Sequence, residues 1–83
     1  MIGKALEEDS LRLLLSQNAV RDARVYRSQV RPGHWSLEIR LGGGSSRMIP
    51  LRSRREPVRT WASLTAVGRF AESVGLLEFR VEL

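Results

Sequence analysis

Hydrophobic and polar residues alternate strictly between residues 35 and 41. Every second position of this stretch is apolar, namely Trp35, Leu37, Ile39 and Leu41. A period of two is typical of a strand that is buried on one face and exposed on the other. The pattern therefore predicts a half-buried strand over residues 35–41.

Three further segments carry strand signals of different quality. Residues 77–83 alternate cleanly, and residues 47–52 alternate around Pro50. Since proline cannot donate a ladder hydrogen bond, Pro50 indicates an edge strand or the end of regular pairing. Residues 24–30 are rich in strand-forming residues, but both faces are mixed in character, so the register of this strand stays open.

Two segments instead show the spacing of an amphipathic helix. Residues 63–74 place apolar side chains three and four positions apart, with Ser63 as N-cap and Gly75 as the C-terminal stop. Residues 4–17 are compatible with a second helix that ends near Asn18, and Asp9 or Ser10 would cap a shorter version. A strand remains the alternative for this N-terminal segment, because Leu11, Leu13 and Leu15 also alternate.

The connections between these segments have turn chemistry. Pro32 and Gly33 fit a tight turn over residues 31–34, and the glycine-rich residues 42–46 fit a hairpin loop. Residues 52–59 are expected to form a polar loop, either a solvated turn or an extra basic finger, and Trp61 behind it is expected in the core. The order αβββαβ predicts an α+β domain over residues 1–83, with an antiparallel or mixed sheet of three to four strands and two helices on one face.

Length and composition limit the kinds of protein that this chain can be. A chain of 83 residues buries roughly 60–65% of its unfolded surface, so pairing of a strand edge with a second copy is expected to add stability, and a homodimer is predicted. The chain has no cysteine and one histidine, His34, so we expect no disulfide, metal site or cofactor. No apolar run is long enough for a bilayer, and no catalytic set of side chains is apparent. The chain is therefore expected to be cytoplasmic and not an enzyme.

The basic residues are concentrated in the middle of the chain. Residues 24–59 contain nine arginines and two glutamates, whereas the segments on either side are each net negative. Arginine binds phosphate and guanine edges with a rigid fork of donors. This clustering favours a polyanion as the partner.

The alternation also predicts which residues share a sheet face. If the apolar positions of the two central strands pack on the helices, the opposite face carries Ser36, Glu38, Arg40, Met48, Arg52 and Arg54. Such a face is flat and basic, and a two-stranded ribbon is narrow enough to enter the major groove. The predicted function is therefore binding of duplex DNA through the polar face of the sheet.

A set of residues along the chain resembles a known family. The segments are Tyr26-Arg27, residues 35–40, Arg47, Thr60-Trp61, Thr65-Ala66 and Arg69-Phe70. Together they resemble the plant apetala-type DNA-binding domain and the related arm-site-binding domains of tyrosine recombinases, which lay a three-stranded sheet in the major groove.

The resemblance covers about half of the chain and implies specific contacts. It makes Arg27, Glu38, Arg40 and Arg47 groove or phosphate contacts, with Arg31 as a fifth. The chain departs from the family pattern because its first strand has fewer arginines, Ile49 stands where a tryptophan is usual, and residues 52–59 are an insertion.

Two other functions are compatible with the sequence. In the first, the chain is a non-catalytic protein–protein interaction module, dimeric through the strand near Leu83 or the segment 11–15, with arginines that serve solubility or an acidic partner. In the second, the helix–strands–helix outline is that of a double-stranded-RNA-binding domain, although the glycine and lysine pattern of its second helix is missing.

Overall fold

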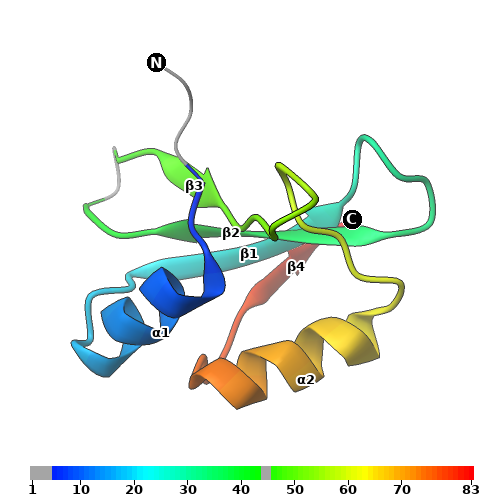
Figure 1. Ribbon diagram of the computed structural model, residues 1–83. Helices are drawn as coiled ribbons and strands as arrows, with labels where there is room; N and C mark the ends of the chain where they lie inside the picture. The colour runs from blue at the N-terminus through cyan, green and yellow to red at the C-terminus, as the bar shows by residue number, and fades with distance from the viewer. Residues whose placement is uncertain (1–4, 44–45) are drawn as a thin grey trace.

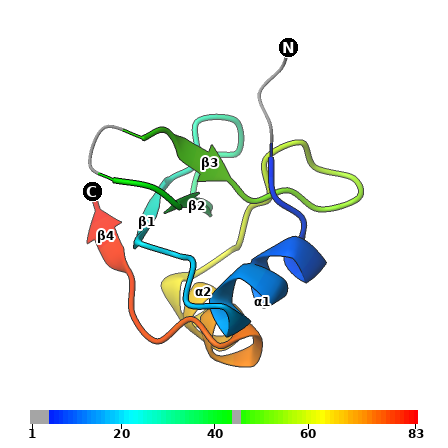
Figure 2. The same cartoon turned by 90° about the vertical axis from the view of Figure 1, so that its left-hand side faces the viewer.

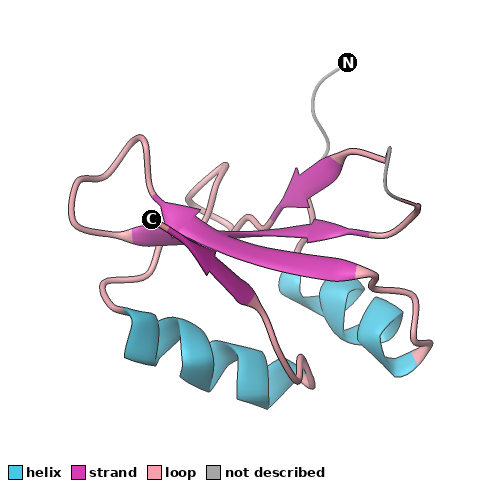
Figure 3. Ribbon diagram, turned by 180° about the vertical axis from the view of Figure 1, so that it is seen from behind, coloured by secondary structure: helices cyan, strands magenta, loops and turns pink. Residues whose placement is uncertain are grey.

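The computed structural model describes residues 5–43 and 46–83 and shows a four-stranded sheet with two helices (Figure 1). Both helices lie on the same side of the sheet, which leaves the other side without a helical layer (Figure 3). The elements in chain order are α1 (Glu8–Ser16), β1 (Asp22–Arg27), β2 (Trp35–Arg40), β3 (Met48–Pro50), α2 (Leu64–Val74) and β4 (Arg80–Glu82). This arrangement confirms the α+β class and the predicted order of elements.

The sheet is mixed, and its strands lie in the order β3-β2-β1-β4. The pairs β1–β2 and β2–β3 are antiparallel, whereas β4 runs parallel to β1. Strand β3, which contains Pro50, is an edge strand as predicted. Strand β4 forms the other edge, so the first strand of the chain lies at the centre of the sheet.

The core lies between the sheet and the helices. Val25, Leu37 and Ile39 point into it from β1 and β2, and all three are fully buried. The helices and connections contribute the remaining buried apolar side chains, among them Leu11, Leu51, Trp61, Val67, Phe70, Ala71, Val74 and Leu76. The prediction that Trp61 belongs to the core is confirmed, and its backbone pairs with that of Trp35.

Helix α2 begins and ends as its sequence predicts. The Ser63 hydroxyl accepts a hydrogen bond from the Ala66 amide at 3.1 Å, which satisfies one free donor of the first turn. Gly75 then adopts a φ of 92°, a left-handed conformation that glycine enters without steric cost.

Helix α1 is shorter than predicted at its N-terminus. It begins at Glu8, and neither Asp9 nor Ser10 caps it. The preceding residues are not helical because Leu6 forms a parallel bridge with Leu51, and residue 4 lies outside the described part of the chain. Asn18 follows the helix with a φ of 55°, as expected of a residue that stops it.

All four strands are also shorter than predicted, β2 by the single residue Leu41. Strand β1 begins two positions before Arg24 and ends at Arg27, after which the Ser28 side chain accepts from the backbone amides of the following turn. Strand β3 ends at Pro50, and β4 includes only residues 80–82 because the chain reaches β1 late, with Leu77 96% exposed. In the part of the chain that the structure describes, no helix is long and apolar enough to cross a membrane.

Candidate nucleic-acid interface

The side of the sheet away from the helices carries six charged residues on three neighbouring strands. We call this set the outer sheet face; its members are Asp22, Arg24, Glu38, Arg40, Arg80 and Glu82. Strand pairing aligns Asp22 with Arg40, and it aligns Arg24 with Glu38 on one side and with Arg80 on the other. Because residues aligned in this way project from the same face, all six side chains lie together.

These six side chains form a continuous network of ion pairs. Arg24 donates to Glu38 on β2, at 3.1 Å from its Nε, and to Glu82 on β4. Arg80 donates to both carboxylate oxygens of Asp22, at 3.0 and 2.9 Å, and to Glu82 at 3.0 Å. The face therefore has three positive and three negative charges that already neutralise one another.

The network also keeps its members ionised. The hydrogen bond from Arg80 holds the pKa of the Asp22 carboxyl below its ordinary value, and the hydrogen bond from Arg24 does the same for the pKa of Glu82. A phosphate that approached Arg24 or Arg80 would have to displace a carboxylate. The outer sheet face is thus balanced in charge, where the sequence predicted a basic surface.

Two residues predicted to contact DNA belong to this balanced face. The Glu38 side chain is 12% exposed and accepts two hydrogen bonds from Arg24. Arg40 donates to the Ser46 carbonyl at 2.6 Å and lies 3.9 Å from Asp22. Arg40 therefore ties the β2–β3 hairpin to the sheet.

A second group of predicted residues lies on two loops at one end of the sheet. The β1–β2 loop carries Arg31, and the loop that follows β3 carries Arg52 and Arg54 together with Arg55. Arg31 lies 3.7 Å from Glu56, so the two loops meet. Both loops rise on the side of the sheet away from the helices (Figures 1 and 2). We call Arg31, Arg52, Arg54 and Arg55 the loop patch.

The net charge of the molecule lies in the two segments that carry the loop patch, which also include Arg27 over Trp35 and Arg59 beside Glu8. Residues 27–34 and 51–60 together contain six arginines and one glutamate, a net charge of +5. The rest of the chain contains eight basic and eight acidic residues, which cancel. The net charge of +5 is therefore confined to these two segments.

Two of the four arginines of the loop patch face water without a carboxylate partner. Arg54 and Arg55 are exposed, and within residues 5–43 and 46–83 neither forms an ion pair. Arg52 donates to the Ser53 carbonyl at 3.2 Å, and Arg31 is 61% exposed beside Glu56. These guanidinium groups can meet an anion without first breaking a network of internal pairs.

The two loops are held in shape by their own hydrogen bonds. In the first, the His34 amide donates to the Arg31 carbonyl at 3.1 Å, and Gly33 adopts a φ of 82°, which completes the predicted turn. In the second, the Thr60 amide and hydroxyl both donate to Glu56, at 3.1 and 2.7 Å. The arginines of the loop patch thus project from closed loops.

The remaining predicted residues lie apart from both groups. Arg27 is the last residue of β1, and its guanidinium stacks over Trp35 at 4.9 Å from the ring centroid. Arg47 is exposed on the β2–β3 connection. This connection lies at the opposite end of the sheet from the β1–β2 loop (Figure 1). Gly44 and Ser45 of the predicted hairpin loop lie outside the described residues.

Arg55 was predicted only as part of the alternative basic finger over residues 52–59, and the ion-pair network was not predicted. Arg55 adjoins Arg54 in a loop, where no alternation assigns it to a face. Arg80 and Glu82 reach the outer sheet face only because β4 pairs in parallel with β1, a long-range pairing without a local signal. The clustering of arginine was the one signal that did lead to the loop patch.

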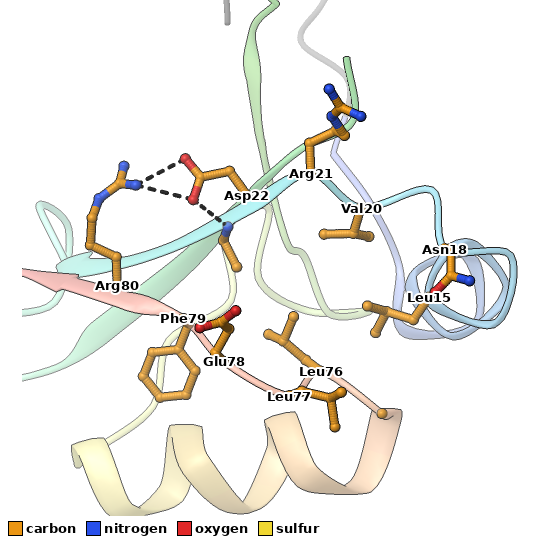
Figure 4. A pocket seen from close by; sticks show the side chains of 12 residues that line it. Leu15, Asn18, Val20, Arg21, Asp22, Leu76, Leu77, Glu78, Phe79 and Arg80 are labelled. Atoms are coloured by element: carbon orange, nitrogen blue, oxygen red, sulfur yellow. Dashed lines mark hydrogen bonds and ion pairs between the residues drawn. The ribbon is translucent and has the colours of Figure 1, made fainter. Parts of the chain in front are cut away.

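A hollow lies at the end of the sheet where β1 begins. Its volume is about 450 Å³, and it separates the end of α1 from the segment that leads into β4. Leu15, Val20 and Phe79 contribute apolar walls, while the Asp22–Arg80 pair lies at the rim (Figure 4). Its polar rim is thus occupied by an internal ion pair.

Two further facts concern metal ions and similarity to known proteins. Residues 5–43 and 46–83 contain no cluster of three or more histidine, cysteine or carboxylate side chains that could hold a metal ion. No family model, curated protein or solved structure matches the chain. The resemblance to the apetala-type domain stays a prediction.

Proposed function

We propose that this protein is a non-catalytic, cytoplasmic DNA-binding protein that grips the phosphate backbone of duplex DNA with its loop patch. The observation that carries the proposal is the confinement of the whole net charge of +5 to two touching segments. Duplex DNA presents a dense row of negative charges, and arginines that neutralise phosphates release counterions, which drives binding. The proposal keeps the predicted ligand and moves the contact from the strands to the loops.

The charge balance of the outer sheet face also favours the loop patch as the DNA-binding surface. Its arginines are engaged by Asp22, Glu38 and Glu82. Carboxylates on a surface repel phosphate. A phosphate that bound these arginines would also have to break the internal ion pairs, which costs their stabilisation. Arg31, Arg54 and Arg55 carry no such cost beyond the single Glu56 contact.

A fluorescence-anisotropy titration with a random duplex over a range of salt concentrations tests the proposal. Up to four phosphate contacts predict a slope of log Kobs against log salt of roughly −2 to −4, since each contact contributes about −0.9. Binding that is absent at low salt would reject the proposal. Equal affinity for a neutral polymer of the same length would reject it as well.

A second candidate function is interaction with another protein chain. Leu77, Val81 and Leu83 are exposed along the segment that contains the edge strand β4. Apolar side chains beside an open strand edge favour pairing with another strand. This surface lies at the β4 edge of the sheet and is separate from the loop patch.

A further inference from the structure

Strand β4 leaves one edge of the sheet open. It pairs with β1 on one side, and it is the last strand in the order β3-β2-β1-β4. Val81 is 38% exposed and Leu83 is 86% exposed. Both residues alternate with the charged residues of the outer sheet face and therefore belong to the helix side.

A groove runs beside this edge on the helix side. It has a volume of about 410 Å³ and lies between α2 and the segment that leads into β4. Gly68 and Ala71 of α2 form one wall, and Leu77 and Phe79 form the other. The groove thus joins an apolar surface to an unpaired strand.

Gly68 lies in the interior of α2 without a reason within the single chain. A Cβ at this position would meet no atom within 4 Å, so neither packing nor backbone approach requires glycine there. Glycine weakens the interior of a helix compared with other residues. The missing side chain leaves the groove open to an atom from outside the chain.

We propose that β4 pairs antiparallel with β4 of a second copy, with Val81 opposite its own equivalent on a two-fold axis. In this register Arg80 lies opposite Glu82 of the second copy, and Glu82 lies opposite its Arg80. Opposite charges that face each other directly stabilise an antiparallel pair. The sequence around β4 is therefore complementary to itself.

The same register fills the groove. Phe79 lies opposite Leu83 of the second copy, and both side chains point to the helix side. Leu83 of the second copy then lies at the mouth of the groove, next to the space that Gly68 leaves. The contact buries the exposed Leu83 of each copy against Phe79 of the other copy.

This pairing of the two β4 strands extends both the sheet and the ion-pair network of a single copy. The two sheets join, and the ion-pair network of the outer sheet face continues across the axis through Arg80 and Glu82. Because the axis is perpendicular to the sheet, the helices of both copies lie on one side and the two loop patches lie at opposite ends. The inference rests on the interaction surface named above and is independent of DNA binding.

Sedimentation equilibrium with matched variants of α2 tests the proposal. The wild-type chain should approach twice 9.4 kDa as its concentration rises. Gly68→Gln should raise the dimer dissociation constant at least tenfold because its side chain fills the groove. Thr65→Gln, at an exposed position of the same helix, should leave it unchanged.

Two further measurements distinguish a loss of dimerisation from a loss of folding or of DNA binding. At a concentration where both proteins are monomeric, circular dichroism should show Gly68→Gln folded and at least as heat-stable as the wild type, since glutamine is the better helix former. Its loop patch should still bind DNA. A wild-type particle of 9.4 kDa at every concentration up to the millimolar range would overturn the inference, as would equal effects of the two glutamine variants.

Single cysteines test the register, because the natural chain contains none. Opposite residues of an antiparallel pair have Cα atoms about 4.5–5.5 Å apart, within reach of a disulfide. Val81→Cys should form a disulfide-linked dimer under mild oxidation, whereas Leu13→Cys, exposed on α1, should not. Faster cross-linking of Phe79→Cys than of Val81→Cys would overturn the register.

Discussion

The loop patch and the outer sheet face are both rich in arginine, yet they are suited to different tasks. On the sheet face Arg24 holds carboxylates from both neighbouring strands, and Arg80 holds Asp22 of β1 and Glu82 of its own strand. On the loops a single glutamate, Glu56, stands among four arginines. The number of acidic neighbours, more than the number of arginines, separates a surface that stabilises the fold from one that can bind an anion.

Charge reversal on the loop patch should have the largest effect. Arg54→Glu/Arg55→Glu replaces two phosphate contacts by two repulsive charges. We expect a loss of DNA affinity of roughly 100-fold or more at 0.1 M salt, since each lost contact alone weakens binding about tenfold there. The free energy of unfolding should change little, because both side chains are exposed; a large loss of stability would show that these arginines hold the fold.

Removal of Arg24 should have the opposite effect: it should lower the stability of the fold and leave DNA affinity nearly unchanged. Arg24→Ala leaves Glu38, with 12% of its side chain exposed, without its partner. We expect the free energy of unfolding to fall by about 1–2 kcal/mol, the cost of an unpaired, partly buried charge. Urea unfolding measures this change, with Arg69→Ala as the control; a DNA affinity that fell as far as in the loop variants would erase the distinction between the two surfaces.

The carboxylates of the sheet face predict a dependence of stability on pH. Hydrogen bonds from Arg80 and Arg24 lower the pKa values of Asp22 and Glu82. Carboxylates with a lowered folded pKa contribute stability that is present above their unfolded pKa and is lost as pH falls through the folded one. Thermal melts should therefore be constant near neutral pH and fall below about pH 4, less steeply in Arg24→Ala; identical profiles for the two proteins would contradict this origin.

Neutralisation of Glu56, the acidic residue beside the loop patch, should have the smallest effect. Hydrogen bonds from the Thr60 hydroxyl and amide lower the pKa of Glu56, so it is charged at neutral pH beside Arg31. Glu56→Gln keeps an acceptor for Thr60 and removes the repulsion of phosphate. We expect DNA affinity to rise by about two- to fivefold, as for one exposed charge; a loss of affinity would place Glu56 itself at the contact.

The fold was largely predictable because its signals are local. Alternation at residues 35–41 and helical spacing at residues 63–74 each depend on a few neighbours, and the structure confirms both elements. The shortened β4 and its parallel pairing with β1 depend on where a distant strand lies. No pattern within residues 77–83 contains that information.

The same limit decided how much of the candidate site could be predicted. The cluster of arginines was visible as composition and contains all four members of the loop patch. Three of them, Arg31, Arg52 and Arg54, had been predicted as contacts. Their separation from Arg40 and Glu38 was not visible, because two of the three carboxylates that neutralise the sheet face, Asp22 and Glu82, come from β1 and β4. Charge balance in space needs the strand order, which the sequence does not provide.

The most direct test of the account compares two double variants of equal net charge. Arg54→Ala/Arg55→Ala removes two arginines of the loop patch, and Arg21→Ala/Arg69→Ala removes two exposed arginines elsewhere. In anisotropy titrations with duplex DNA, the loop variant should flatten the slope of log Kobs against log salt by about 1.8 and weaken binding up to roughly 50-fold at 0.1 M salt. The second variant should match the wild type; equal losses in both would mean that net charge alone attracts the DNA and would contradict the assignment of the loop patch.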